Sequence, residues 1–339
     1  MSWERISLCT LLYGDYPELA QRVLTGIGIN LPWGHAWVQD VRIGLNEVGD
    51  ATARYVDQWA QRQPVPVTTY DAGRNVYKYP LMRRMFRDKV PGFPALATWA
   101  NWFDDDSYLD PCFPWDELMM EAEVADMIGK PYVWFVRGRQ WDWVQAQPWH
   151  DPRVGPPKAY RGKPVFHFFQ GGWWLLRQSV ICRYNWPFEE LVHRGGDSTL
   201  GELMRQQGLR TVLGAHRRHL GFLSRVHTNA DAAGRDSKSP RRGYSGDCLG
   251  EAYDPHRSID LSHHHFDLTA RVYATDANTG QRTVKEHFLP GPHHEDSREH
   301  VQPARTAAGL PAGQDSGDGP HPSPEQADRG WDGGRPTAG

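Results

Sequence analysis

The chain of 339 residues lacks cysteine pairs, long apolar segments and a dominant charge. Its four cysteines form no Cys-x-x-Cys motif, which argues against a disulfide or zinc framework and favours a reducing compartment. No segment approaches the roughly 18 apolar residues of a membrane span, and the beginning of the sequence has no signal-peptide pattern. The formal net charge of −3 indicates no class of partner. We therefore expect a cytoplasmic protein without a membrane span.

The large aromatic side chains are unevenly distributed along the chain. Fourteen of the fifteen tryptophans lie at or before Trp186, and the fifteenth is Trp331. Because aromatic burial contributes strongly to a core, the packed part should lie in the first two-thirds of the chain. We predict a domain over 1–227 and an extension over 228–289 that is partly ordered at best, with a hairpin near 266–285. A tail over 290–339, rich in Pro, Gly and Asp, is predicted to be disordered.

Apolar runs alternate with amphipathic segments through the first half of the sequence. Strands are expected over 6–13, 37–45, 64–70 and 95–103. Helices are expected over 18–24, from about residue 50, over 79–88 and over 115–129. Further strands and an active-site loop are expected within 131–170, followed by a helix over 199–207 and closing strands over 211–213 and 220–227. This alternation predicts an α/β fold with a doubly wound parallel sheet.

Three consecutive carboxylates, Asp104, Asp105 and Asp106, follow the uncharged run 95–103. Ligands of open α/β sheets bind outside the carboxyl ends of the strands, so the triplet should face a site. Side chains two apart on an extended segment point the same way, so Asp104 and Asp106 can hold one ion while Asp105 points elsewhere. Carboxylate oxygens suit Mg²⁺ or Mn²⁺. The alternative interpretation is a solvated acidic turn.

The order of four motifs resembles that of glycosyltransferases with the GT-A fold, of the broad family-2 type. The motifs are Asp104-Asp105-Asp106, Gly171-Gly172-Trp173, Gly195-Gly196-Asp197 and a late histidine, His216 or His227. The resemblance covers roughly residues 4 to 227. Two departures stand out: Ser198 follows Asp197 where the family often has a second acidic residue, and Asn46 and Glu47 replace an acidic pair after the second strand.

The resemblance implies a Rossmann-like, mostly parallel sheet flanked by helices. The composition beyond residue 227 predicts a largely irregular C-terminal extension. The resemblance also implies metal-dependent transfer of a sugar from a nucleotide-sugar, expected to be UDP-linked, to an acceptor hydroxyl. Mn²⁺ or Mg²⁺ would be held by Asp104, Asp106 and His227, with His216 as the competing third ligand. Asp197 would act as the base of an inverting reaction, and a simple helix cap is the alternative role for this residue.

The same resemblance assigns further residues to the donor and the acceptor. Donor-binding residues would be Tyr13, Asp15, Asn46, Glu47, Arg74, Lys78, Asp104 and Asp105. Acceptor-binding or sugar-binding residues would be Gly171, Gly172, Trp173 and Trp174. The donor residues at the ends of the first two strands can equally be ordinary turn residues, and Arg74 and Lys78 can be solvated surface charges. Of Trp173 and Trp174, we expect one to stack on a sugar and the other to belong to the core.

The acceptor and the exact reaction stay open at the level of sequence. A glycan, a small molecule, a lipid-linked acceptor or a hydroxylated base in DNA, as some phage glycosyltransferases use, would all fit, and the last would place the protein in a host cytoplasm. A sugar nucleotidyltransferase is one alternative, although the segment 13–17 has a single glycine where such enzymes have a Gly-rich loop. A Trp-rich carbohydrate-binding protein without enzymatic activity is the other.

The tail composition generates the first prediction. Residues 290–339 bury too little apolar surface to offset the entropy of ordering them. A chain ending near Leu289 should therefore melt at the same temperature as the full chain in a calorimetric scan. A large drop in melting temperature would show that the tail packs on the domain.

Overall fold

The computed structural model of the chain describes residues 4–34, 36–135, 141, 144–155, 165–189, 191, 196–212, 220–222, 265–276 and 279–291. Its strands are β1 (Ile6–Tyr13), β2 (Val38–Asn46), β3 (Val67–Asp71), β4 (Trp99–Asp104), β5 (Ser107–Leu109), β6 (Met127–Phe135), β7 (Val165–Arg177), β8 (Thr211–Val212), β9 (Leu220–Phe222), β10 (Leu268–Thr275) and β11 (Arg282–Leu289). Its helices are α1 (Pro17–Gly34), α2 (Asp50–Ala60), α3 (Lys78–Arg87), α4 (Trp115–Ala122), α6 (Gln178–Arg183) and α7 (Gly196–Gln206).

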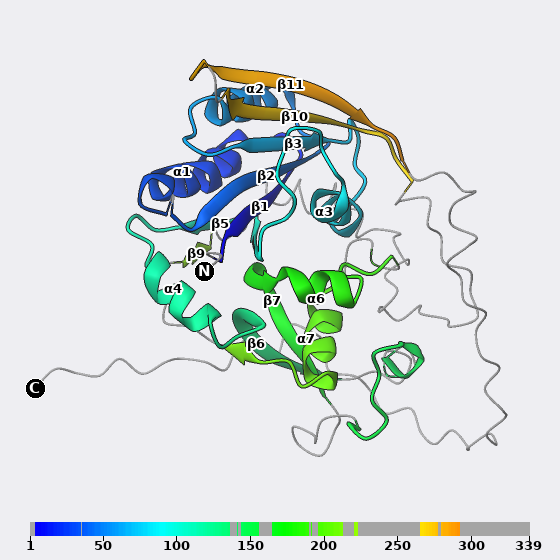
Figure 1. Ribbon diagram of the computed structural model, residues 1–339. Coiled ribbons are helices and arrows are strands. Elements are labelled where there is room, and N and C mark those ends of the chain that lie inside the picture. Colours follow the sequence, from blue (N-terminus) through cyan, green and yellow to red (C-terminus); the bar gives the residue numbers. More distant parts are fainter. Residues whose placement is uncertain are drawn as a thin grey trace, which may run out of the picture. The chain divides into compact units, whose positions relative to one another are not determined.

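One large sheet organises the described residues (Figure 1). Its strand order is β11-β10-β3-β2-β1-β4-β7-β6-β8, and β3, β2, β1 and β4 run parallel to one another. Strands β7 and β10 join this parallel centre in the antiparallel direction, one on each side. The predicted fold class, an α/β sheet with parallel strands flanked by helices, is confirmed. The short strands β5 and β9 form a separate antiparallel pair.

Helices cover both faces of the sheet, and each face has its own hydrophobic core. Helices α3, α6 and α7 pack on one face, where Trp102 and Trp174 stack with ring centroids 6.0 Å apart. Helices α1, α2 and α4 pack on the other face, around Trp99 and Phe103. Figure 1 shows the two groups of helices on opposite sides of the strands. Alternate residues of β4 thus enter alternate cores, as the pleat of a strand buried on both faces requires.

Two helices differ in length from the sequence-based expectation. Helix α1 continues to Gly34 rather than ending near residue 24, although glycine weakens a helix interior. A Cβ atom on Gly26 would lie 2.8 Å from the carbonyl oxygen of Leu109, so glycine lets α1 approach β5 closely. Helix α4 ends at Ala122 instead of 129, because Met127 and Ile128 already pair with β7 and β8 in the sheet.

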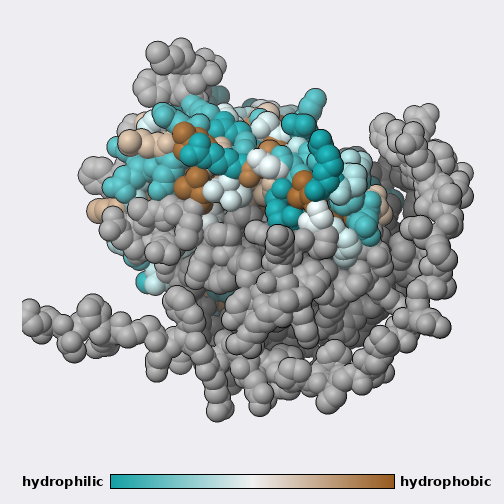
Figure 2. Space-filling model, turned by 90° about the horizontal axis from the view of Figure 1, so that it is seen from below, coloured by the Kyte–Doolittle hydropathy of each residue, from teal (hydrophilic) through white to brown (hydrophobic). Residues whose placement is uncertain are grey.

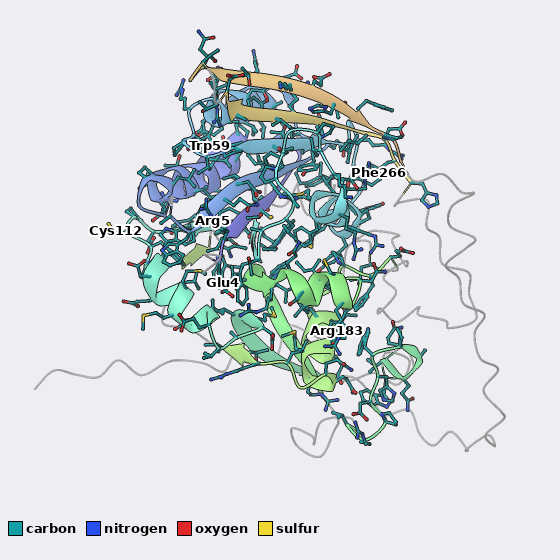
Figure 3. The ribbon with its side chains drawn as sticks, in the orientation of Figure 1. Glu4, Arg5, Trp59, Cys112, Arg183 and Phe266 are labelled. Carbon is teal, nitrogen blue, oxygen red and sulfur yellow. The ribbon has the colours of Figure 1, made fainter. Side chains whose placement is uncertain are left out.

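The predicted hairpin forms and extends the main sheet. Strand β10 pairs with β3, and β11 pairs with β10. Arg84 of α3 holds the open end of the hairpin, since its guanidinium donates to the carbonyl oxygens of Phe266 (2.5 Å), Leu289 (3.2 Å) and Pro290 (3.1 Å). Figure 3 shows Phe266 beside α3. A truncation after Gly291 instead of Leu289 therefore keeps these contacts intact.

Among the described residues, the exposed large hydrophobic side chains are Ile29, Met120, Val124, Val284 and Phe288. On the face shown in Figure 2, hydrophilic side chains predominate and hydrophobic ones are scattered. Scattered apolar residues are ordinary on protein surfaces. A search of the described helices for one long and apolar enough to cross a membrane found none.

A buried ion pair connects the centre of the sheet to the segment before β4. Arg42 and Asp40 of β2 are almost fully buried, with Nε and Oδ1 3.0 Å apart. The Arg42 guanidinium also donates to the carbonyl oxygens of Met85 (2.6 Å) and Pro94 (2.8 Å). The Ser7 hydroxyl donates to Asp40 at 3.0 Å and accepts the Ala97 N–H at 2.9 Å. This network joins β1, β2, α3 and the segment that leads into β4.

The buried pair generates a stability prediction. Asp40→Asn keeps the side-chain volume but leaves the buried Arg42 without its counter-ion, and breaking such a pair costs about 3–5 kcal/mol. The free energy of unfolding, measured by urea titration, should fall by this amount. Glu123→Gln is the matched control, because Glu123 is exposed and the same chemical change there should be neutral. A loss below about 1 kcal/mol for Asp40→Asn would contradict a structural role for the pair.

Candidate functional site

The candidate site lies at the carboxyl edge of the parallel strands, where the strand order reverses. The chain proceeds from β1 to β2 and β3 on one side and then returns to place β4 on the other side of β1. Ligands of open α/β sheets bind at such a switch point. The register places Tyr13 opposite Asn46 and Asp104 opposite Leu11. The sheet therefore brings the ends of β1, β2 and β4 to one edge.

The acidic triplet has the alternation that an extended segment imposes. Asp104 ends β4 and is partly exposed, Asp105 is buried, and Asp106 is partly exposed again. Only two of the three carboxylates are thus turned toward solvent at this edge, and they are the two that the sequence predicts to act together. The placement is compatible with a shared ion at Asp104 and Asp106.

Lys78 binds the first carboxylate of the triplet. Its Nζ atom lies 2.7 Å from Oδ1 of Asp104, and the indole N–H of Trp102 donates to the same oxygen at 2.8 Å. Lys78 begins α3, which packs against β2 and β1 on the face that carries Trp102. The start of α3 therefore faces the end of β4.

Asp197 reaches the same place from a distant part of the chain. The Tyr79 hydroxyl donates to Oδ1 of Asp197 at 3.3 Å across a sequence separation of 118 residues. Gly196 makes this approach possible, because a Cβ atom there would lie 2.1 Å from Oη of Tyr79. Tyr79 escaped the sequence-based prediction, since a tyrosine beside a lysine at a helix start carries no local signal of function.

The carboxylates of the site influence the protonation of Lys78. Burial by itself lowers the pKa of the Lys78 ammonium, but the negative charges of Asp104, Asp197 and Asp106 outweigh it, and the pKa is raised. Lys78 is therefore a cation at any physiological pH. The charges of three carboxylates, from β4, the turn after it and α7, therefore act on one ammonium at the carboxyl edge.

Several predicted donor-binding residues have structural contacts that the sequence did not indicate. Asn46 is buried: its Oδ1 accepts the Val76 N–H at 2.8 Å, and its amide donates to Asn75 at 3.0 Å. Its side chain therefore anchors the loop before Lys78 through both its oxygen and its nitrogen. The role of Asn46 in donor binding stays a prediction.

The other predicted donor residues line the same edge. Asp15 is exposed and lies against the beginning of α2, where a Cβ atom on Gly49 would be 2.3 Å from its carboxylate. Glu47 is exposed with φ of 56°, Arg74 is exposed, and Tyr13 is partly buried. Their placement brings them near the strand ends, and their roles toward a donor stay predictions.

Trp173 and Trp174 belong to the core, and this corrects the expected sugar platform. They are 3% and 2% exposed and enter opposite cores, paired with Phe103 and Trp102 across β4 and β7. A ring buried in a core cannot stack on a sugar without leaving its packing partners. Strand β7 runs antiparallel to β4, and Trp173 pairs with Phe103 at the end of their shared register. Gly172 and Gly171, which precede Trp173, therefore lie toward the acidic end of β4.

The donor set at the triplet fits a hard divalent cation bound together with a phosphate ligand. Among the described residues, no group of three or more His, Cys, Asp or Glu side chains is arranged to hold a metal ion. Mg²⁺ is usually held by only one or two carboxylates, substrate phosphates and water, and Asp104 and Asp106 can supply the two carboxylates. The predicted third ligand His227, its competitor His216, and Gly195 lie outside the described residues.

The similarity of this chain to known proteins is limited to solved structures. No protein-family model matches the chain, and no curated protein matches it. Among solved structures, a mannosyltransferase of Pyrobaculum calidifontis in complex with GDP-Man and Mn²⁺ is similar with a TM-score of 0.41, 13% identity and 62% of this chain covered. TarS of S. aureus is similar with a TM-score of 0.38, 10% identity and the same coverage of this chain.

The likeness spans 54% of the mannosyltransferase chain and 35% of TarS. At these TM-scores it carries no weight for function. The class that the fold and site define is an α/β protein with an acidic, lysine-bridged cluster at the switch point of its sheet.

The contact between Gly196 and Tyr79 generates a prediction. Gly196→Ala would place a methyl group inside the buried Tyr79 ring, which already packs edge-on against Trp186 with centroids 5.9 Å apart. Overpacking of this kind typically costs about 1–3 kcal/mol. The free energy of unfolding should fall accordingly, whereas Gly155→Ala, with nothing within 4 Å of its Cβ, should be neutral. Equal effects of the two substitutions would contradict the close approach of α7 to α3.

Proposed function

We propose that this protein is a metal-dependent glycosyltransferase that uses a nucleotide-sugar donor. The observation that carries the proposal is the convergence of Asp104, Asp106 and Asp197 around Lys78 at the switch point of the sheet. Two of these carboxylates suit a divalent cation, and the third stands at the first turn of a helix from another part of the chain. The motif order of the sequence supports the same class.

The cation would be held by Asp104 and Asp106 and would neutralise the negative charge that develops on the departing nucleoside diphosphate. Lys78 supports a donor site at the same place, because an ammonium group is a good partner for phosphate oxygens. Asp105, also assigned to donor binding, lies buried between Asp104 and Asp106. The expected donor is a UDP-linked sugar, with Tyr13, Asp15, Glu47 and Arg74 nearby at the edge.

Asp197 is the proposed general base of an inverting reaction. It would accept the proton of the acceptor hydroxyl as that oxygen attacks the anomeric carbon from the side opposite the leaving group. The first turn of a helix favours its ionised form through the helix dipole. The Tyr79 hydroxyl, 3.3 Å from Oδ1, supports a fixed orientation of the carboxylate.

The alternatives have less support from the site. A carbohydrate-binding protein would need accessible aromatic platforms, and Trp173 and Trp174, the two tryptophans considered for sugar stacking, are buried. A sugar nucleotidyltransferase lacks a supporting feature in the loop after β1, which has one glycine between Tyr13 and Pro17. The acceptor hydroxyl would belong to a glycan, a small molecule or a modified base in DNA.

A panel of nucleotide-sugars tests the class directly. With Mn²⁺ or Mg²⁺ present, we expect at least one donor to raise the melting temperature and to be hydrolysed slowly without an acceptor. Asp106→Ala removes a hard oxygen ligand, so it should lose both the stabilisation and the hydrolysis. Full hydrolysis by Asp106→Ala in EDTA, or no response of the unmodified chain to any donor, would contradict the proposal.

Asp197→Asn tests the base separately from donor binding. Loss of a general base typically slows turnover about 10²- to 10⁴-fold, while donor affinity should be unchanged because the proposed metal ligands lie on β4 and the turn that follows it. Transfer rate, donor affinity and anomeric configuration of the product should be measured together. Near-normal turnover would reduce Asp197 to a helix cap, and a product with retained configuration would exclude the inverting reaction.

A further inference from the structure

Lys78 is bound to Asp104, the first ligand of the proposed cation. Its ammonium lies 2.7 Å from Oδ1 of Asp104, and only 16% of its side chain is exposed. The ammonium also lies 5.6 Å from the ring centroids of both Tyr79 and Trp102. Such aromatic faces attract a cation. The lysine is thus held on three sides at the acidic end of β4.

The carboxylates of the cluster need a positive charge nearby. Asp104 binds the Lys78 ammonium directly at 2.7 Å, and the charges of Asp106 and Asp197 also act on that ammonium. Like charges gathered at partly buried positions repel one another unless a cation compensates them. In the chain without ligands, Lys78 supplies that compensation.

We propose that Lys78 is the resident counter-ion of the acidic site and must leave Asp104 before a divalent cation can bind there. The inference rests on the proposed function and adds to it an exchange between two cations. Lys78 and the metal would share one carboxylate. Repulsion between the monovalent ammonium and the divalent cation at such a spacing would weaken metal binding by about tenfold or more.

The exchange gives Lys78 a second position. A lysine has a flexible stem with four methylene groups, so its ammonium can turn from Asp104 to a phosphate oxygen of the donor while α3 stays in place. Metal binding without a nucleotide should then be weak, since it leaves the displaced ammonium without a new anionic partner. Binding of a nucleoside diphosphate should strengthen metal binding, and the converse must hold by linkage.

The first test measures Mn²⁺ alone, without nucleotide, by calorimetric titration. Lys78→Met removes the competing cation and leaves the carboxylates in place, so Mn²⁺ should bind at least about tenfold more tightly than to the unmodified chain. Lys78→Arg keeps a cation and should stay near the unmodified affinity. Lys89→Met is the charge-matched control, because Lys89 is exposed and follows the far end of α3.

Equal or weaker Mn²⁺ binding by Lys78→Met overturns the proposal, and so does the absence of Mn²⁺ binding to both chains. Neither result decides the proposed function, which the nucleotide-sugar panel tests on the unmodified chain. Conversely, tighter binding by Lys78→Met together with no response to any donor would keep the cation exchange and remove the glycosyltransferase.

A second measurement uses the unmodified chain, in case Lys78→Met does not fold without metal. The ammonium resonance of Lys78, assigned by its absence from the spectrum of Lys78→Arg, should show a hydrogen bond to Asp104 in nuclear magnetic resonance spectra. Saturating Mg²⁺, which is diamagnetic, should abolish that hydrogen bond. A hydrogen bond that persists at saturation overturns the proposal.

Discussion

The buried pair of Arg42 and Asp40 anchors the segment that leads into β4, the strand that ends at the acidic triplet. The Arg42 guanidinium also donates to the carbonyl oxygens of Met85 and Pro94. One side chain of β2 therefore holds both the end of α3 and the segment before β4. Asp40 reaches Ala97 through the Ser7 hydroxyl, which sets the beginning of β4 beside β1. These polar groups cannot be left unpaired in the core, so the geometry around them is rigid.

Helix α3 transmits this constraint to two other regions. Its first residues, Lys78 and Tyr79, contact Asp104 and Asp197, whereas Arg84, farther along, holds the ends of the C-terminal hairpin. The loop before α3 is in turn anchored by Asn46. A helix held at both ends fixes the backbone position of Lys78 and still allows its side chain to turn. The same helix joins the C-terminal strands to the sheet that carries the acidic triplet.

The site itself depends on a close approach that only glycine allows. Helix α7 meets α3 where Gly196 faces the Tyr79 ring, and Asp197 is the next residue. A larger residue at 196 would separate the two helices and remove Asp197 from the lysine. The candidate base and the candidate metal ligands thus come together through packing between helices, although they belong to segments about a hundred residues apart.

The sequence by itself determined the parallel centre of the fold and the position of the triplet, because an uncharged run followed by three carboxylates is a local pattern. It also determined the alternation of Asp104, Asp105 and Asp106, which follows from the pleat of an extended chain. Only the tertiary structure decided that Asn46 anchors a loop, that Trp173 and Trp174 are core residues, that Lys78 binds Asp104, and that Tyr79 joins the site. These roles depend on contacts with residues distant in sequence. Residue type and local spacing do not determine which distant residues the fold brings into contact.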